Sequence, residues 1–600
     1  PASYFLNNAG GSDAFVSKLD ASGNFLWARQ LGGPGDEVGR SLAVDASGNV
    51  YICGYFNGTA DFDPGPGTFN LVTTSGQAAF ICKLDAAGNF VYAKQITGSG
   101  LNGAISDALS LAPDGGGNIL VSGIFSATAD FDPGAGVYNI TAFGAGDAYV
   151  LKLDAAGNFV WAIQLGGVDN DYAYGVAADA AGNVYASGIS FGTGDYDPGA
   201  GVYELGNAGG IDAYVCKLSP SGNFIWAKQI AGAGTDYIYS LAVDGSGNVY
   251  TTGFFTGTTY FDPVSGAHSL TSAAGSRDAY VCKFDPAGNV VWAKQFGGTG
   301  DDNSYAVAVD AAGNVYTTGT YLGTVDFDPG SGTFTLGTTG GNQNAFISKL
   351  DGSGNFIWAK QLGGLYSVLA SAVGVDAGGS VYAAGSFQGT IDFDPGATVY
   401  NLTATGSHDI FLVKLASTAL PVQLLNFSAI VHDKNMVDIS WATATEINNN
   451  YFTVERSADA RSFEQVAVIK GATNSSLPLS YMTTDKTPLP GKSYYRLRQT
   501  DLDGKFTNSA IVQVEVPASS GAFTIYPNPV HNLLQIQLPG FANTKIVWQV
   551  QDETGRVLLQ QSGEANTLRQ TIDVSALPNG MYHLVLKTGD HTTVKKFIRQ

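Results

Sequence analysis

The chain has 600 residues, of which 79 are glycine and 14% are charged, and its formal net charge at pH 7 is −21. A chain of this length divides into several domains, each of which can bury a core of its own. The acidic balance argues against nucleic acid as a partner, and no apolar run approaches the roughly 20 residues of a transmembrane helix. Abundant glycine with aromatic and β-branched residues favours an all-β protein with many tight turns.

An internal repeat fills residues 1–418 and carries the negative charge, a net of −22. Each unit contains four short segments of alternating polarity, which in the unit at 41–98 read "SLAVD", "NVYICGYF", "AAFICKLD" and "NFVYAKQ". This alternation, with turn residues between the segments, predicts four antiparallel strands, the signature of a β-propeller blade. A lysine recurs every 65 to 69 residues on the third segment, as Lys18, Lys83, Lys152, Lys217, Lys283, Lys349 and Lys414.

Two turns of each unit share the pattern Asp-x-x-Gly, in which the aspartate side chain can accept backbone N–H bonds and glycine takes the left-handed position. We predict a structural role for these aspartates. The aromatic residue of the fourth segment predicts contacts between blades in preference to a sugar-binding platform. These aromatic residues are Trp27, Tyr92, Trp161, Trp226, Trp292 and Trp358. The four cysteines, Cys53, Cys82, Cys216 and Cys282, are predicted to be buried free thiols.

The motif "DFDPG" follows the second segment in four units, "DYDPG" at Asp195 takes its place in a fifth, and "YFDPV" at Tyr260 takes its place in a sixth. Its two carboxylates can meet one calcium ion, although calcium requires further oxygen ligands. Asp-Pro-Gly also makes a stable turn without a metal, and we favour this second interpretation. The candidate calcium ligands are Asp61, Asp63, Asp130, Asp132, Asp195, Asp197, Asp326, Asp328, Asp392 and Asp394.

The motifs "VDAAGNVY" at 309–316 and "DAYVLKLDAAGN" at 147–158 resemble a bacterial β-propeller repeat. The resemblance implies the fold and says little about activity. The sequence contains six first-and-second hairpins and six fourth segments, yet seven third segments. We therefore expect seven blades, the first of them truncated at the N-terminus, with the missing strands and an export signal upstream. Six blades with one redundant strand are the alternative.

Residues 419–517 lose the repeat and regain lysine, arginine and glutamate. Their alternating segments predict a small β-sandwich, with Trp441 and Tyr495 as core aromatics. The pattern resembles the fibronectin type III-like module that precedes export domains in bacterial surface proteins. We expect a spacer without a catalytic site.

Residues 518–600 contain "FTIYPNPVHNLLQIQLPG", "WQVQDETGRVLL" and "IDVSALPNGMYHLVLKTGDHTTVKKFIRQ". These segments, in this order, resemble the type A C-terminal sorting domain of type IX secretion substrates. The matching residues are Tyr526, Pro527, Asn528, Pro529, Asp552, Gly555, Arg556, Gly580, Tyr582, Lys595, Lys596 and Phe597.

The resemblance implies a route of export in a Gram-negative bacterium. Its expected partners are an outer-membrane translocon, a shuttle β-barrel that recognises the C-terminal domain, and a sortase. The expected destination is the cell surface or the medium.

The propeller is expected to bind an extracellular ligand, a glycan or a protein, and not to be an enzyme. Acid–base catalysis needs convergent polar groups, whereas residues 1–418 contain only two histidines, His268 and His408, and two glutamates, Glu37 and Glu204. An enzyme acting on extracellular polysaccharide and a passive surface or matrix scaffold are the alternatives. Calcium is the one cofactor that the sequence suggests.

Overall fold

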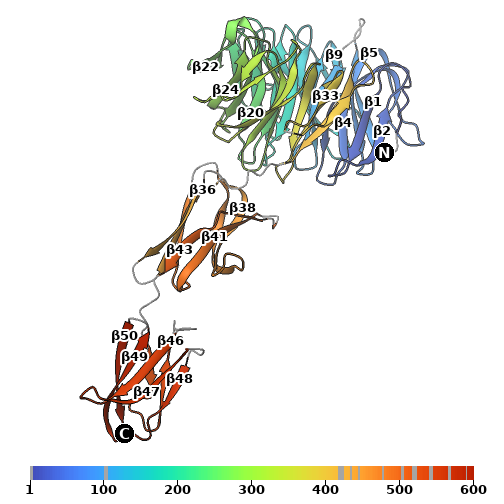
Figure 1. Ribbon diagram of the computed structural model, residues 1–600. Coiled ribbons are helices and arrows are strands. Elements are labelled where there is room, and N and C mark those ends of the chain that lie inside the picture. Colours follow the sequence, from blue (N-terminus) through green and yellow to red (C-terminus); the bar gives the residue numbers. More distant parts are fainter. Residues whose placement is uncertain are drawn as a thin grey trace. The chain divides into compact units, whose positions relative to one another are not determined.

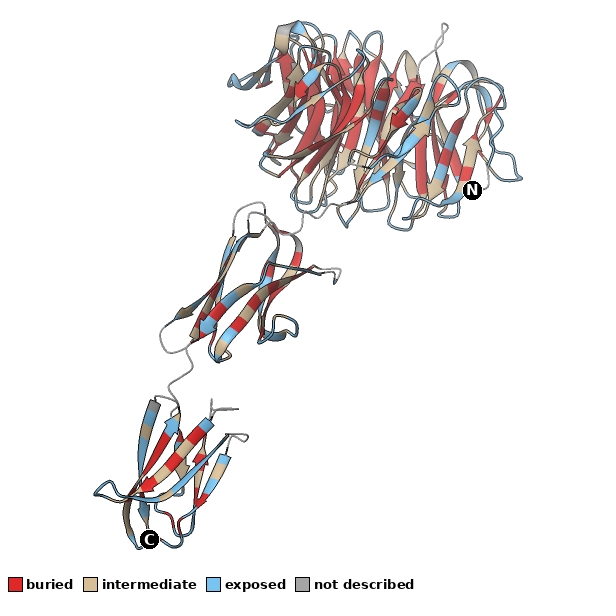
Figure 2. Ribbon diagram, in the orientation of Figure 1, coloured by how far each residue is buried: buried red, intermediate tan, exposed pale blue. Residues whose placement is uncertain are grey.

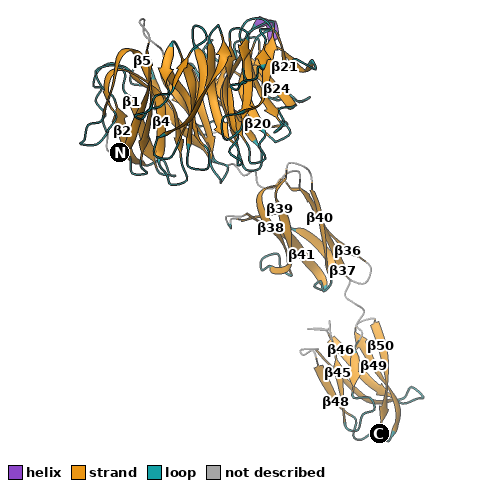
Figure 3. Cartoon of the chain, turned by 180° about the vertical axis from the view of Figure 1, so that it is seen from behind, coloured by secondary structure: helices purple, strands orange, loops and turns teal. Residues whose placement is uncertain are grey.

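The computed structural model describes residues 4–99, 106–396, 398–416, 424–432, 436–443, 446–475, 479–501, 504, 506–516, 523–538, 545–564, 569–588 and 591–600. The chain divides into two compact units, Pro1–Ser417 and Thr418–Gln600. In the described residues the regular structure is β-strand apart from one short 3-10 helix, Ala273–Gly275, so the all-β prediction is confirmed (Figure 3). None of the described helical residues forms a helix long and apolar enough to span a membrane.

The described part of the first unit forms seven blades, as the number of third segments predicts. Figure 1 colours these strands from blue through green to yellow along the sequence. Each complete blade is an antiparallel sheet in which successive strands are neighbours. The complete blades are β3 (Glu37–Val44), β4 (Val50–Asp61), β5 (Asn70–Leu84) and β6 (Phe90–Ser99); β7 (Ser106–Pro113), β8 (Ile119–Phe125), β11 (Asp147–Leu153) and β12 (Phe159–Gly167); β13 (Asp171–Ala178), β14 (Val184–Ser190), β17 (Asp212–Leu218) and β18 (Phe224–Gly232); β19 (Asp236–Val243), β20 (Val249–Phe255), β23 (Asp278–Phe284) and β24 (Val290–Gly298); and β25 (Asn303–Val309), β26 (Val315–Tyr321), β29 (Asn344–Leu350) and β30 (Phe356–Leu362).

The first and last blades have fewer strands among the described residues. The first consists of β1 (Ala14–Leu19) and β2 (Phe25–Leu31), which correspond to third and fourth strands. The last consists of β31 (Val368–Val375), β32 (Val381–Phe387) and β35 (Asp409–Leu415), which correspond to first, second and third strands.

A repeated lysine contact joins neighbouring blades and joins the last blade to the first. Lys18 Nζ donates to the carbonyl oxygen of Ala86 in the following blade at 2.9 Å. The same contact recurs from Lys83, Lys152, Lys217 and Lys283 at 3.1 to 3.3 Å. Lys414 of the last blade donates to Ala21 of the first at 3.1 Å. The two incomplete blades are therefore neighbours in the ring.

Small hairpins extend the blades at their periphery. They are β9 (Thr128–Asp130) with β10 (Asn139–Thr141), β15 (Gly194–Asp195) with β16 (Glu204–Leu205), β21 (Thr258–Asp262) with β22 (Ala267–Thr271), β27 (Thr324–Asp326) with β28 (Thr335–Gly337), and β33 (Thr390–Asp392) with β34 (Asn401–Thr403). β9, β15, β21 and β27 each pair with the fourth strand of the preceding blade, so these hairpins also join blades.

The core of the propeller lies within and between the blades, where the second and third strands of the complete blades are mostly buried (Figure 2). First strands of successive blades pack against one another and therefore line the inside of the ring. The predicted contact between blades is confirmed for three fourth-strand aromatics, which donate their indole N–H groups to a carbonyl of the next blade at 3.1 to 3.3 Å: Trp161 to Pro220, Trp226 to Pro286 and Trp292 to Gly352. All four cysteines are buried free thiols, as predicted.

The described residues 424–516 form a β-sandwich whose core contains Trp441 and Tyr495, as predicted. The two side chains are 1% and 0% exposed. One sheet contains β36 (Leu424–His432), β37 (Met436–Thr443) and β40 (Leu479–Asp485). The other contains β39 (Glu464–Ser475), β38 (Glu446–Ser457), β41 (Gly491–Asp501) and β42 (Phe506–Asn508), and β43 (Val512–Val516) also pairs with β41.

The described residues 523–600 form a second β-sandwich with a core of its own. Its sheets are β44 (Thr524–Tyr526), β45 (Leu533–Gln537) and β48 (Arg569–Asp573), and β47 (Val557–Glu564), β46 (Lys545–Gln551), β49 (Gly580–Thr588) and β50 (His591–Arg599). The predicted domain boundaries at 418/419 and 517/518 lie outside the described residues.

Candidate functional site

The head of the last sandwich docks onto the final strand of the chain. Asn528 Nδ2 donates to the Lys596 carbonyl at 3.1 Å, and its Oδ1 accepts the Ile598 N–H at 2.8 Å. Both bonds use backbone groups of β50, so the amide side chain acts as a local strand partner. The fold thus brings together two predicted sorting motifs, "YPNP" and "KKFIRQ", that are about 70 residues apart.

Val530 strengthens this junction and was not singled out in the sequence. Its N–H donates to the Ile598 carbonyl at 2.8 Å, and its own carbonyl accepts the Gln600 N–H at 2.9 Å. The side chain is 1% exposed. Its apolar character directly after the second proline is the signal that sequence reasoning could have used.

The remaining sorting residues have structural positions in the same sandwich. Asp552 Oδ1 accepts the N–H groups of Thr554 and Arg556, each at 3.0 Å, and Gly555 takes a φ of +85° to close the turn. The Thr554 side chain is the largest cause of the lowered pKa of Asp552. Gly580 begins β49 opposite Arg599 of β50.

An aromatic pair holds the two last strands together, and two exposed lysines directly precede its phenylalanine in the sequence. Tyr582 and Phe597 stack with ring centroids 5.6 Å apart, and the Tyr582 hydroxyl donates to the Pro578 carbonyl at 2.7 Å. Phe597 is wholly buried, whereas Lys595 and Lys596 are exposed. The exposed members, which include Pro527, Asn528 and Pro529, provide the surface that a secretion partner can reach.

The first aspartate of the "DFDPG" motif organises the loop that contains it. Asp61 Oδ1 accepts the N–H of Asp63 at 3.0 Å and that of Phe69 at 2.8 Å. The same two bonds, at 2.8 to 3.0 Å, recur at Asp130, Asp195, Asp326 and Asp392. One carboxylate therefore fixes both ends of the loop, as an Asx-type turn does.

The second aspartate makes the turn itself. Asp63 Oδ1 accepts the Gly65 N–H at 2.8 Å, and a side chain added at Gly67 would come within 2.2 Å of Oδ2. In the described residues no group of three or more His, Cys, Asp or Glu side chains is arranged to hold a metal ion. The geometry supports the turn, and calcium binding stays a prediction to be tested.

The aromatic residue between the two aspartates is a core residue that sequence reasoning missed. Phe131 is wholly buried, 5.1 Å from Phe125 and 5.0 Å from Tyr149 between ring centroids. Each of its equivalents is at most 4% exposed: Phe62, Tyr196, Phe261, Phe327 and Phe393. The motif therefore anchors each loop in its blade.

A pair of substitutions separates the turn from a calcium site. Asp326→Asn keeps an oxygen acceptor, so we expect little change in melting temperature, whereas Asp326→Ala removes two bonds and should cost about 0.5–2 kcal/mol of stability. Both effects should be the same in calcium and in chelator, as measured by thermal melting. A calcium-dependent rise in wild-type stability that Asp326→Asn abolishes would contradict the turn interpretation.

Buried carboxyl groups recur where first strands begin. Burial, opposed by a backbone N–H bond from Gly33, raises the pKa of Glu37 to about 7. Burial likewise raises the pKa of Asp171 to about 6, of Asp236 to about 7 and of Asp302 to about 8. Raised pKa values occur in catalytic acids. Here the buried carboxyl groups repeat in register around the ring. The backbone N–H groups of Gly33, Gly167 and Gly298 donate to Glu37, Asp171 and Asp302, respectively, so these carboxyl groups hold blades in place.

The other polar residues considered for catalysis lie in separate places. Glu204 is exposed on β16 of a peripheral hairpin. His268 is exposed on β22, with a φ of +56°. The His408 ring nitrogen Nε2 is 2.8 Å from Gln388 Nε2 in the last blade.

Comparison with known families identifies two parts of the chain. Residues 524–600 match the secretion system C-terminal sorting domain. Residues 26–63, 225–253 and 291–320 match the beta-propeller repeat. The chain contains β-propeller repeats and a type IX secretion sorting domain. The sorting domain marks it for export across the outer membrane to the cell surface or the extracellular space. The fibronectin type III-like character of the middle sandwich stays a prediction.

Curated relatives share only part of their length with this chain. An uncharacterized WD repeat-containing protein of Acanthamoeba polyphaga mimivirus is 26% identical over 33% of this chain and 16% of its own length. The regulatory protein FlaEY of Caulobacter vibrioides is 26% identical over 38% of this chain and 23% of its own length. The chain therefore spans less than a quarter of either relative.

Among solved structures, dimeric latent PorU from Porphyromonas gingivalis is 12% identical to this chain. The match covers 58% of this chain and 34% of the PorU chain, with a TM-score of 0.14. A TM-score this low carries no structural argument.

Proposed function

We propose that the exported chain is a non-catalytic binding or adhesion protein, in which the propeller meets an extracellular ligand. The observation that supports this most strongly is the use of its aspartates. In the described propeller the carboxylates of the Asp-x-x-Gly turns and of the "DFDPG" loops accept backbone N–H groups. These carboxylates therefore stabilise turns and loops. The result is a rigid scaffold that presents surface side chains.

The sorting domain supplies the partners of export. An interaction with the type IX secretion system follows from this domain. We infer that the translocon, the shuttle β-barrel and the sortase bind the surface formed by "YPNP" and β50, because the exposed residues of the two motifs lie together on this surface.

A binding screen tests the proposed role. Protein collected from the medium or released from cells is expected to bind a glycan or a matrix protein saturably, with no change in the ligand. The measurement is calorimetric titration, with product analysis of each mixture by mass spectrometry. Cleavage of a polysaccharide would favour the enzyme, and the absence of binding to any glycan or protein would favour a passive scaffold.

A further inference from the structure

The blades differ from one another at two positions on the inner strands. A β-bulge follows the third residue of β13, next to Tyr174, and equivalent bulges occur in β3, β7, β19, β25 and β31. The residues at the bulge are Arg40, Leu109, Tyr174, Tyr239, Tyr305 and Ser371. Two positions earlier, the residues are Val38, Asp107, Tyr172, Tyr237, Asn303 and Leu369. The repeat is thus irregular at these two positions of the inner strands.

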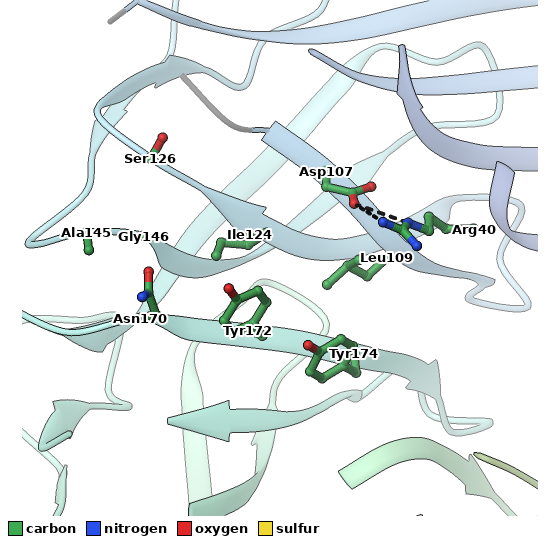
Figure 4. Close-up of a pocket in the computed structure, with 10 residues that line it drawn as sticks. All are labelled: Arg40, Asp107, Leu109, Ile124, Ser126, Ala145, Gly146, Asn170, Tyr172 and Tyr174. Atoms are coloured by element: carbon green, nitrogen blue, oxygen red, sulfur yellow. Dashed lines mark hydrogen bonds and ion pairs between the residues drawn. The ribbon is translucent and has the colours of Figure 1, made fainter. Parts of the chain in front are cut away.

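Tyr172 and Tyr174 form a stacked aromatic pair on β13. Their ring planes are 3° apart and their centroids are 5.5 Å apart. The rings lie opposite Ile124 and Leu109 of the preceding blade (Figure 4). The space between is a pocket of about 280 Å³, which is close to the lower limit for small-molecule sites.

The far end of this pocket is polar and has no net charge. Arg40 Nη2 lies 3.1 Å from Asp107 Oδ2, and Nε donates to the same oxygen at 3.2 Å (Figure 4). Asp107 is 6% exposed, and its other oxygen, Oδ1, is buried without a hydrogen-bond partner among the described residues. Asn170 adds an amide to the pocket lining.

The aromatic surface continues from the pocket along the next two inner strands. The hydroxyl oxygens of Tyr174 and Tyr237 are 2.6 Å apart, which joins two blades. From there the row runs to Tyr239 and then to Tyr305, with centroid distances of 4.7 and 5.0 Å. A ligand seated in the pocket therefore meets further tyrosine rings in one direction.

We propose that this pocket binds a sugar ring of a neutral oligosaccharide and that the tyrosine row receives the neighbouring rings. The partly exposed rings of Tyr172 and Tyr174 suit the apolar face of a pyranose, and the hydroxyl and amide groups suit its rim of hydroxyls. The net charge of −22 over residues 1–418 repels anionic glycans, and the Arg40–Asp107 pair leaves no charge for a cationic side chain. The inference rests on the proposed binding function and names its site.

The test titrates the full chain with three kinds of probe by calorimetry. These are neutral oligosaccharides of glucose, mannose and galactose, oligosaccharides that contain uronic acid, and collagen as a protein. We expect saturable binding of one neutral oligosaccharide, and we expect Tyr172→Ala and Tyr174→Ala each to weaken it about tenfold. Asn170→Ala should weaken it as well, without removal of any ring. Tyr260→Ala, at a tyrosine 39% exposed on the peripheral hairpin of β21, is the matched control and should bind as wild type does.

The outcomes separate the pocket from the proposed function. Neutral-sugar binding that survives Tyr172→Ala, Tyr174→Ala and Asn170→Ala would overturn the pocket and leave the binding role standing. Binding of uronate oligosaccharides or collagen alone would also overturn it. No binding to any probe would count against the binding role itself. Melting curves identify a variant that fails to fold, and Asn170→Ala then decides the question.

Discussion

A chain that lacks β50 and Gln600 is expected to cross the inner membrane and stop in the periplasm. Removal of this strand takes away the backbone partners of Asn528 and Val530, and it removes Phe597 from the core. An edge strand of the four-stranded sheet and the docked head would be lost together, so the recognition surface cannot form. The measurement is protease accessibility on intact cells, combined with fractionation.

Asn528→Ala provides a milder form of the same experiment. It removes two hydrogen bonds and leaves the sandwich core intact. We expect less surface protein than with the wild type and more than with the deletion. Wild-type surface display by the deleted chain would contradict the assigned role of this sandwich.

Phe131→Ala is expected to destabilise the propeller by about 3–5 kcal/mol, the usual cost of truncating a buried phenylalanine. The ring is wholly buried against Phe125 and Tyr149, and a cavity would remain in its place. The measurement is the midpoint of urea unfolding. Phe143→Ala, in the same blade at a residue 66% exposed, is the control and should leave the midpoint nearly unchanged. Equal midpoints for the two variants would show that the motif does not anchor its loop.

Much of the fold could be predicted because the same strand and turn patterns recur in every repeat. Period-2 alternation and Asp-x-x-Gly turns identify each strand, and seven recurrences of one lysine give the number of blades. The lysine contact itself could not be predicted, since it joins a third strand to a turn of the next blade. That contact depends on how blades pack, which no single repeat encodes.

The candidate sites were less accessible from the sequence. The matching sorting residues could be found, but their junction needed the fold, because Asn528 and Ile598 meet only when the sandwich closes. The tyrosine row was missed for a different reason. Tyr172, Tyr174 and Tyr239 resemble ordinary strand aromatics, and only their common place inside the ring distinguishes them from core residues.

The most direct test of the account is whether residues 518–600 are sufficient for export. The measurement is surface labelling of a periplasmic reporter protein that carries a signal peptide and this C-terminal segment, in cells with and without the type IX translocon. We expect labelled reporter on cells with the translocon and periplasmic reporter in cells without it. Reporter that stays in the periplasm of both, or reaches the surface of both, would contradict the claim that this domain is the sorting signal.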